Sequence, residues 1–515
     1  MHKRTLARVH YTQRGKARVD AVAVSADLDE NLSWLKKYLG YKETFDLIAR
    51  EFKIGQKRAG LIYIDSFVSQ TDLTLIMERF LQAPESAMAE ASLTELLNRR
   101  IPYIELTTET ELSKTAEQIL SGPCALLVDG VSHAVIMDVR KYPDREPSEP
   151  SLERVLRGPH DGFVETMIFN TIMIRRRLRD PNLRVEIHEA GRRSKADIAL
   201  IFIKDIANEH LVGDVRRRIK AIDVDVLTMS EKALQEWIVR KPWWNPFPVI
   251  RFTERPDVAA EHLSEGHVLV IIDTSPNAII LPVTLFSFLQ SVEEYHEDVL
   301  IGSYLKWVRF VGMLFSWLGP PLWYAMLASH TRLGSGWNIL VSPQIRQIPI
   351  FWQLTAAEVG VDLLRLALIF APNPLGQSMG FFGAVLMGSV AVKAKLLDAE
   401  VMIYVVVAAV GTFSAPDIDF GMAIRVLRAF LLIATGVGAI FSLPWTGFCL
   451  GVLIPLAILA NTRSLGVSYL WPLWPWSASF FGAGLIRKPL NVKVMRPPVT
   501  LPQDPTHRRP PEPGS

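Results

Sequence analysis

The chain has 515 residues, two cysteines and a formal net charge of +3. Its length exceeds that of one ordinary domain, and so small a net charge argues against a nucleic-acid-binding protein, which needs a concentrated basic face. Cys124 lies in a polar region and Cys449 in an apolar one, so neither a disulfide framework nor a zinc site is expected. Residues 1–20 are basic and lack an apolar core, which predicts that there is no signal peptide and that the polar part stays in the cytoplasm.

The distribution of charge divides the chain into a polar part and an apolar part. Positions 310–329 and positions 429–462 contain no charged residue. A helix that crosses a bilayer needs about 20 predominantly apolar residues in a row, so these stretches predict membrane spans behind a soluble head. We therefore expect a basic arm at 1–26, a first lobe at 27–150, a second lobe at 151–300, a transmembrane domain at 301–486 and a proline-rich, disordered cytoplasmic tail at 487–515.

The first lobe begins with a predicted helix. Leucines recur at helical spacing from Leu28 to Leu39, an aspartate at 27 or 29 can cap the start, and Gly40 can end the helix. Residues 59–68 form an apolar run typical of a buried strand, and residues 124–140 indicate two strands around a turn.

The same order of elements recurs in the second lobe. A helix is expected from Asn170, a strand at 199–207 and a strand–turn–strand unit at 267–283. Asn31 precedes Asn170 by 139 positions, and Gly122 precedes Gly266 by 144. The alternation of helices and strands together with this nearly constant offset predicts an α/β head of two related lobes. At the end of the head, Ser291 and Glu294 have the spacing of a capping box.

The apolar part divides into about six predicted spans. Their limits follow the charges and prolines, at 307–328, 347–370, 376–394, 400–416, 421–443 and 445–461. An even number of spans places both termini on one side, and the basic tail places that side in the cytoplasm. Lys393 and Lys395 fall on the outer side in this arrangement, which argues against it. Trp471, Trp474 and Trp476 suit the headgroup zone better than a seventh crossing.

The second span carries the candidate functional residues. Thr355, Glu358, Asp362 and Arg365 are spaced three, four and three apart, so they line one face of a helix. Because an ionisable group inside a bilayer costs at least about 2.5–3.5 kcal/mol, such a stripe normally faces protein or water. One interpretation is an ion path, with Gly383 and Gly388 of the third span as further pore-lining candidates.

Two other interpretations of this stripe remain open. In one, Glu358 or Asp362 forms an ion pair with Arg425 or Arg428 of the fifth span, which only holds the helices together. In the other, the second predicted span lies in the membrane interface and does not cross. In the head, the arginine runs at 175–177 and 216–218 fit a solvated or subunit-contact face better than a phosphate site. The sequence has no phosphate-binding loop and no hydrolase motif, so an enzyme is not expected.

Several long motifs resemble one known family. They lie at 153–184, 245–260, 265–276 (EGHVLVIIDTSP), 290–295 (QSVEEY) and 462–475 (TRSLGVSYLWPLWP). Together they resemble the A subunits of spore germinant receptors of the GerA type, over residues 27 to 480. The SKAD sequence at 194–197 and the EGHV and DTSP sequences are closest to the stage V sporulation protein AF branch of that family.

The resemblance implies a role in spore germination at the inner spore membrane. It implies a homo-oligomeric, pentameric ion channel subunit that releases ions or amplifies their release, with other spore-membrane germination proteins and the lipid bilayer as partners, and without nucleic acid, metal or cofactor. The alternative is a membrane-anchored scaffold, or a receptor subunit that binds partner proteins or a nutrient and conducts no ions itself. The longer basic arm, the proline-rich tail and the tryptophan-rich segments at 243–244 and 471–476 depart from the family pattern.

Overall fold

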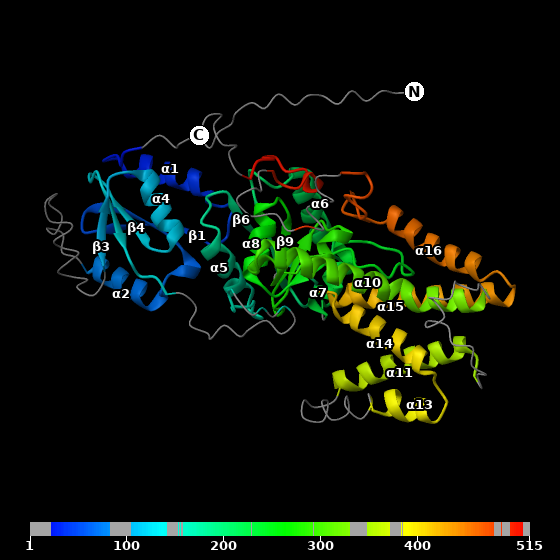
Figure 1. The fold of residues 1–515 in the computed structure, drawn as a ribbon. Coiled ribbons are helices and arrows are strands. Elements are labelled where there is room, and N and C mark those ends of the chain that lie inside the picture. Colours follow the sequence, from blue (N-terminus) through cyan, green and yellow to red (C-terminus); the bar gives the residue numbers. More distant parts are fainter. Residues whose placement is uncertain are drawn as a thin grey trace, which may run out of the picture. The chain divides into compact units, whose positions relative to one another are not determined.

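The computed structural model is shown in Figure 1. It describes residues 22–82, 105–141, 153, 155, 158–227, 229–291, 293–329, 348–370, 383, 385–477, 486 and 495–507. The chain forms two compact units. The first contains residues 1–146, 166–188 and 199–204, and the second contains residues 147–165, 189–198 and 205–515.

The first sheet has five strands. Its order is β1 (Leu47–Ile54), β2 (Lys57–Ile64), β4 (Cys124–Val128), β5 (Ala134–Met137) and β3 (Leu106–Glu109), with antiparallel pairing throughout. Leu61 and Ile62 are neighbours on β2, and because side chains alternate along a strand they enter different cores. Helices α1 (Leu28–Leu39) and α4 (Leu112–Ser121) cover the face of Ile62, and α2 (Gln70–Leu81) covers the face of Leu61.

Helix α1 confirms the predicted start and stop signals. The Asp27 carboxylate accepts hydrogen bonds from the backbone N–H groups of Asp29 and Glu30, which would otherwise lack a partner in the first turn. Gly40 follows the last residue with φ of 73°, a left-handed conformation that costs glycine little. Between them, Leu28, Leu32, Leu35 and Leu39 are buried on one face.

The second sheet repeats the strand order of the first. It runs β6 (Leu183–Ala190), β7 (Ala196–Ile203), β9 (Val268–Ile272), β10 (Ala278–Leu281) and β8 (Arg251–Thr253). Its helices are α5 (Met167–Arg177), α6 (Glu209–Lys220), α7 (Ser230–Ile238) and α8 (Pro256–Ser264). Helix α6 begins 139 residues after α2, and α8 begins 144 residues after α4. The strand order thus agrees with the repeat predicted from the sequence.

The C-terminal part is helical. Its longer elements are α10 (Val299–Ala328), α11 (Ile350–Phe370), α14 (Ala399–Phe413), α15 (Ile418–Ile440) and α16 (Pro444–Asn461), with the short α9 (Glu293–His296), η5 (Leu386–Val390) and α13 (Ala391–Lys393). Within the described residues, α10, α15 and α16 are long and apolar enough to cross a membrane, whereas α14 is apolar but shorter. This is fewer than the predicted six, because α11 carries three charged residues and most of the predicted third span lies outside the described residues.

The second lobe and the helical block (residues 299–461) share one apolar core. Phe247 and Phe288 of the lobe pack with Phe420 of α15, Leu459 of α16 and Tyr469. Tyr469 follows a short hairpin of β11 (Arg463–Ser464) and β12 (Val467–Ser468). A buried ionic contact joins the same parts at the entry to α10.

Glu294 forms that contact. It is fully buried, forms an ion pair with Arg309, and lies 4.0 Å from Lys306. Its carboxylate also accepts a hydrogen bond from the backbone N–H of Ser291 at 3.4 Å, which is one half of the predicted capping box. Burial raises the pKa of Glu294, and the two cations oppose this.

The tail segment (residues 495–507) differs from the expected disordered tail. Gln503 donates its backbone N–H to Ile206 O at 2.8 Å, and Thr500 donates its hydroxyl to Glu265 O at 2.9 Å. Arg496 donates to Ser264 O at 2.7 Å and forms an ion pair with Asp504 at 3.0 Å. Hydrogen bonds from its backbone and side chains to carbonyl groups of the second lobe hold this part of the tail in place despite its prolines.

Candidate functional site

Four charged residues meet where α11, α14 and α15 pack against α10. We call Glu358, Asp362, Arg425 and Arg428 the charge cluster. Arg428, near the middle of α15, is 1% exposed. Its Nη2 lies 2.6 Å from Glu358 Oε2 of α11. Its Nη1 donates to Ser316 O and Oγ on α10, at 3.0 and 2.8 Å, and at 3.3 Å to Ala408 O and Thr412 Oγ1 on α14. One guanidinium therefore cross-links four helices.

The second ion pair of the charge cluster is more open. Arg425 pairs with Asp362, one turn after Glu358 on α11 and one turn before Arg428 on α15. The Arg425 side chain is 7% exposed and that of Asp362 is 46% exposed. Glu358 Oε1 and Arg428 Nε are buried without a hydrogen-bond partner among the described residues. The cluster is thus more enclosed at Glu358, whose side chain is 14% exposed, and reaches the surface of the single chain at Asp362.

The remaining candidates on α11 differ in their surroundings. Arg365 donates to the sulfur of Met422 and stacks over the Phe413 ring at 5.7 Å, which extends the polar stripe beyond Asp362. Thr355 is half-buried, and its hydroxyl is engaged within its own helix, where it donates to Phe351 O at 2.8 Å.

The two glycine candidates also differ. A Cβ on Gly383 would lie 2.4 Å from Leu364 Cδ1, so the chain contacts α11 closely there. Gly388 has no atom within 4 Å of such a Cβ and faces open space.

Contacts along α15 fix the direction of α11. Phe351 of α11 packs on Gly436 of α15, Glu358 meets Arg428, and Arg365 meets Met422. Residue numbers rise on one helix as they fall on the other, so α11 runs antiparallel to α15 over most of its length. Because α15 starts at the core shared with the lobe, α11 runs back toward the lobe.

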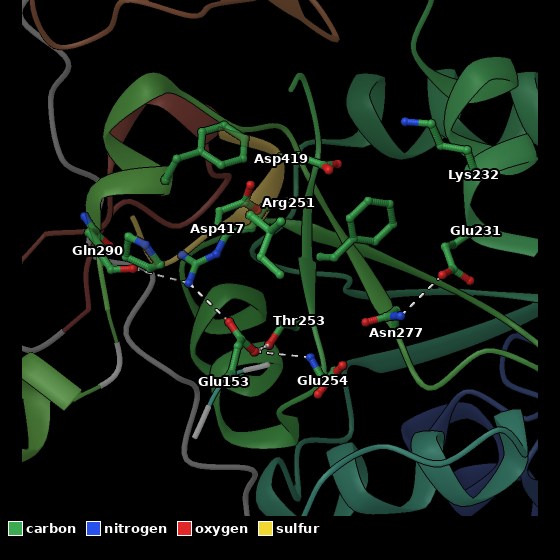
Figure 2. A pocket seen from close by; sticks show the side chains of 14 residues that line it. Glu153, Glu231, Lys232, Arg251, Thr253, Glu254, Asn277, Gln290, Asp417 and Asp419 are labelled. Carbon is green, nitrogen blue, oxygen red and sulfur yellow. Dashed lines mark hydrogen bonds and ion pairs between the residues drawn. The ribbon is translucent and has the colours of Figure 1, made fainter. Parts of the chain in front are cut away.

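A cavity of about 400 Å³ lies where the second lobe meets the start of α15. Figure 2 shows Glu153 and Arg251 on one side of it and Glu231 with Asn277 on the other. Glu153 accepts from the Thr253 hydroxyl at 2.6 Å and lies 3.7 Å from Arg251. The acidic groups outnumber the basic ones, and Phe252, Phe288 and Ile418 give part of the wall an apolar character.

Asp417 links this cavity to α15. Its carboxylate accepts a hydrogen bond from Phe420 N at 2.8 Å and so caps the helix that carries Arg425 and Arg428. Burial raises the pKa of Asp417 to about 6; the Phe420 N–H and Arg251 oppose the shift, and Asp419 adds to it. The capping carboxylate therefore keeps its proton to a higher pH than an ordinary aspartate does.

Some functional contacts were not predicted from the sequence. The partners of Arg428 include Ser316 and Thr412, whose hydroxyls lie 2.6 Å apart in otherwise apolar helices. A small hydroxyl in each of two apolar spans is the signal that could have indicated them. Gln353 and Asp398 also join α11 to the start of α14, where Asp398 N donates to Gln353 Oε1 at 2.7 Å.

The arginine runs of the head are structural in part. Arg175 is buried and forms an ion pair with Asp46 at 2.6 Å. Arg218 donates to Ile238 O at 2.7 Å, and Arg217 pairs with Asp214 one turn earlier on α6. Within the described residues, no group of three or more histidine, cysteine, aspartate or glutamate side chains could hold a metal ion.

An α/β head joined through a shared core to apolar helices defines a two-part protein of the membrane-associated type. The profile of the Bacillus/Clostridium GerA spore germination protein family matches residues 33–499. The chain belongs to this family, as the motifs in the sequence indicated.

Individual relatives extend over nearly the whole chain. It is 36% identical to stage V sporulation protein AF of Bacillus subtilis over 92% of this chain and 95% of that protein. It is 28% identical to spore germination protein B1 of the same organism, over 94% of this chain and all of that protein. Among solved structures, the chain matches the crystal structure of the N-terminal domain of the A subunit of the Bacillus megaterium spore germinant receptor GerK3, with 26% sequence identity. The match covers 50% of this chain and 96% of that domain, with a TM-score of 0.39.

Proposed function

We propose that the chain is a multi-span subunit of a spore germination complex in the inner spore membrane, and that several copies enclose an ion path lined by α11. The head and the tail would lie on the cytoplasmic side. The observation that carries the proposal is the half-exposed Asp362 on a helix that packs at the depth of the apolar spans.

The exposed part of the polar stripe requires a partner. Facing lipid, an ionised side chain at this depth would cost several kcal/mol. Asp362 and Arg365 lie at the surface of the single chain, whereas Glu358 is held inside by Arg428. Water in a space between copies, or the polar side chains of another copy, would satisfy them. The stripe therefore has two tasks in this proposal: Glu358 braces the helices, and Asp362 and Arg365 line the path.

The helix directions support six spans. Helix α11 runs antiparallel to α15. Helix α14 runs antiparallel to α10, because Tyr404 near its start stacks on Trp323, whereas Gly411 near its end packs on Gly312. Hence α10 and α15 lead away from the lobe, while α11 and α14 return. In this proposal the outward crossing between α11 and α14 is the predicted third span, most of which lies outside the described residues.

Flux from reconstituted protein tests the proposal. Purified protein in liposomes is expected to release potassium, and Asp362→Asn is expected to change the rate severalfold while oligomer size stays constant. Asp223→Asn, an exposed carboxylate of the head, is the matched control and should have no effect. Unchanged flux in Asp362→Asn, with normal assembly, would remove Asp362 from the path.

A scaffold is the second candidate function. It is favoured by the closed ion pair between Glu358 and Arg428, which needs no water to explain it. In this case the helices only anchor lobes that bind other germination proteins. Liposomes that contain the assembled protein but pass no ions above the lipid background would favour the scaffold over the channel.

A further inference from the structure

Two adjacent tryptophans of the soluble lobe point away from the protein. Asn245 donates its backbone N–H to Pro242 O at 3.0 Å, so residues 242–245 form a tight turn, which we call the tryptophan turn. Trp243 and Trp244 occupy its two central positions and are 94% and 53% exposed. Large apolar side chains exposed next to each other usually mark a contact surface.

The tryptophan turn is fixed to the end of α16. The Asn245 amide donates to Thr462 Oγ1 at 3.0 Å, and Thr462 is the residue that follows the last turn of this helix. Asn245 also accepts a hydrogen bond from Phe247 N at 3.0 Å, and Phe247 enters the core that contains Leu459 of α16. The depth of Trp243 and Trp244 is therefore set by the depth of the end of α16.

A second exposed tryptophan pair is fixed to the same end. Tyr469 donates its backbone N–H to Thr462 O at 3.1 Å, and the Ser468 hydroxyl donates to Trp474 O at 2.7 Å. Trp474 and Trp476 are 69% and 62% exposed. Two segments far apart in the sequence thus present tryptophans beside one helix terminus.

The surroundings have the character of a membrane boundary. Helix α16 exposes Leu450, Leu453 and Ile454 in its middle, whereas its last residue is Asn461. Arg463 follows that end and Arg240 precedes the tryptophan turn, and both are exposed. Tryptophan prefers the level where hydrocarbon gives way to headgroups, and nearby cations attract anionic headgroups.

We propose that the tryptophan turn is a lipid-binding surface of the second lobe, with Trp243 and Trp244 in the headgroup layer of the bilayer that α16 crosses. The proposal rests on the membrane insertion of α16 stated above. Its consequence is that the lobe touches the membrane directly, beside the helix that leaves it.

Spin labels can measure these depths separately. In the described part of the chain, Cys449 on α16 is exposed, whereas Cys124 is buried and burial raises the pKa of its thiol to about 12, so a label attaches at Cys449. Accessibility of that label to oxygen and to a water-soluble nickel complex, in liposomes with phosphatidylglycerol, reports whether α16 is inserted. Trp243→Cys and Met229→Cys, each with Cys449→Ala, then report the turn and an exposed aqueous control in the same lobe.

The expected depth at position 243 lies between the other two sites. The label at Cys449 should favour oxygen strongly, the label at 229 should favour nickel, and the label at 243 should be intermediate, with Trp244→Cys agreeing. A label at 243 as accessible to nickel as the label at 229, while Cys449 remains inserted, would overturn the lipid surface and leave the spans intact. Dipolar broadening at 243 that persists in detergent would show a contact between copies and would also overturn it.

Discussion

Arg428 Nη2 lies 2.6 Å from Glu358 Oε2, and the same guanidinium hydrogen-bonds to α10 and α14. This pair joins helices that are far apart in the sequence, in a region that is otherwise apolar. Because a buried charge without a partner is costly, removal of either member should leave the other in an unfavourable environment. The stability of the helical block therefore depends on this pair.

Removal of the cation alone should be severe. We expect Arg428→Met to destabilise the block by about 3–5 kcal/mol, because it leaves the Glu358 carboxylate buried without a cation. Glu358→Gln should cost less, and the double variant should recover part of the loss. Thermal unfolding in detergent measures the three variants, and additive losses in the double variant would contradict the coupling.

The packing of α10 on α14 should be intolerant of a single methyl group. A Cβ on Gly411 would lie 2.2 Å from the carbonyl oxygen of Gly312, which belongs to the backbone and cannot turn away. We expect Gly411→Ala to lower stability by about 1–3 kcal/mol, as overpacking does. Gly388→Ala is the matched control, since open space surrounds that position. Equal melting temperatures of the two variants would contradict the close contact.

Asp417 should make the junction between lobe and helices sensitive to pH. Burial raises the pKa of Asp417 to about 6, whereas an unfolded aspartate titrates near 3.9. The folded state therefore binds this proton more tightly, and the free energy of unfolding falls as pH rises from about 4 to about 6, by on the order of 3 kcal/mol.

Asp417→Asn tests this directly. Asparagine still caps the helix but does not titrate. Subtracting the melting temperature of the variant from that of the wild type should give a difference that falls between pH 4 and 6 and is constant above about 7. A difference that does not vary with pH would show that Asp417 has an ordinary pKa.

The tail segment should protect the second lobe from hydrogen exchange. Deletion of residues 495–515 removes the contacts of Gln503 with Ile206 and of Thr500 with Glu265. We expect faster exchange at 205–209 and 263–267. Deletion of residues 508–515 alone is the control and should leave these amides unchanged. Equal exchange in both deletions would show that the segment does not bind the lobe in solution.

Most of the head was predictable because its signals are local. Leucine spacing, Asp27 and Gly40 define α1 from a short window, and the repeat offset relates the elements of the two lobes. The charged stripe on α11 was also readable as one helix face. Arg425 and Arg428 were named as possible partners of this stripe, but the sequence could not choose between these ion pairs and water, because that choice depends on which helices pack together.

Roles were hardest to predict for residues that carry no charge and belong to no periodic hydrophobic pattern. Ser316 and Thr412 lie in apolar helices, and only their packing around Arg428 gives them a role. The tail has the composition of a disordered segment, yet its backbone finds hydrogen-bond partners on the lobe. Whether the exposed end of the stripe meets lipid, water or another copy depends on assembly, which no local pattern encodes.

Both α10 and α16 are attached to the second lobe, which constrains how a movement of the lobe can be transmitted to the helices. Glu294 anchors the start of α10, and Asn245 anchors the end of α16. A tilt of the lobe would therefore move the start of α10 and the end of α16 together, in opposite directions along the membrane normal. The lobe can transmit torque to the bundle, but it cannot swing freely like a domain on a flexible tether.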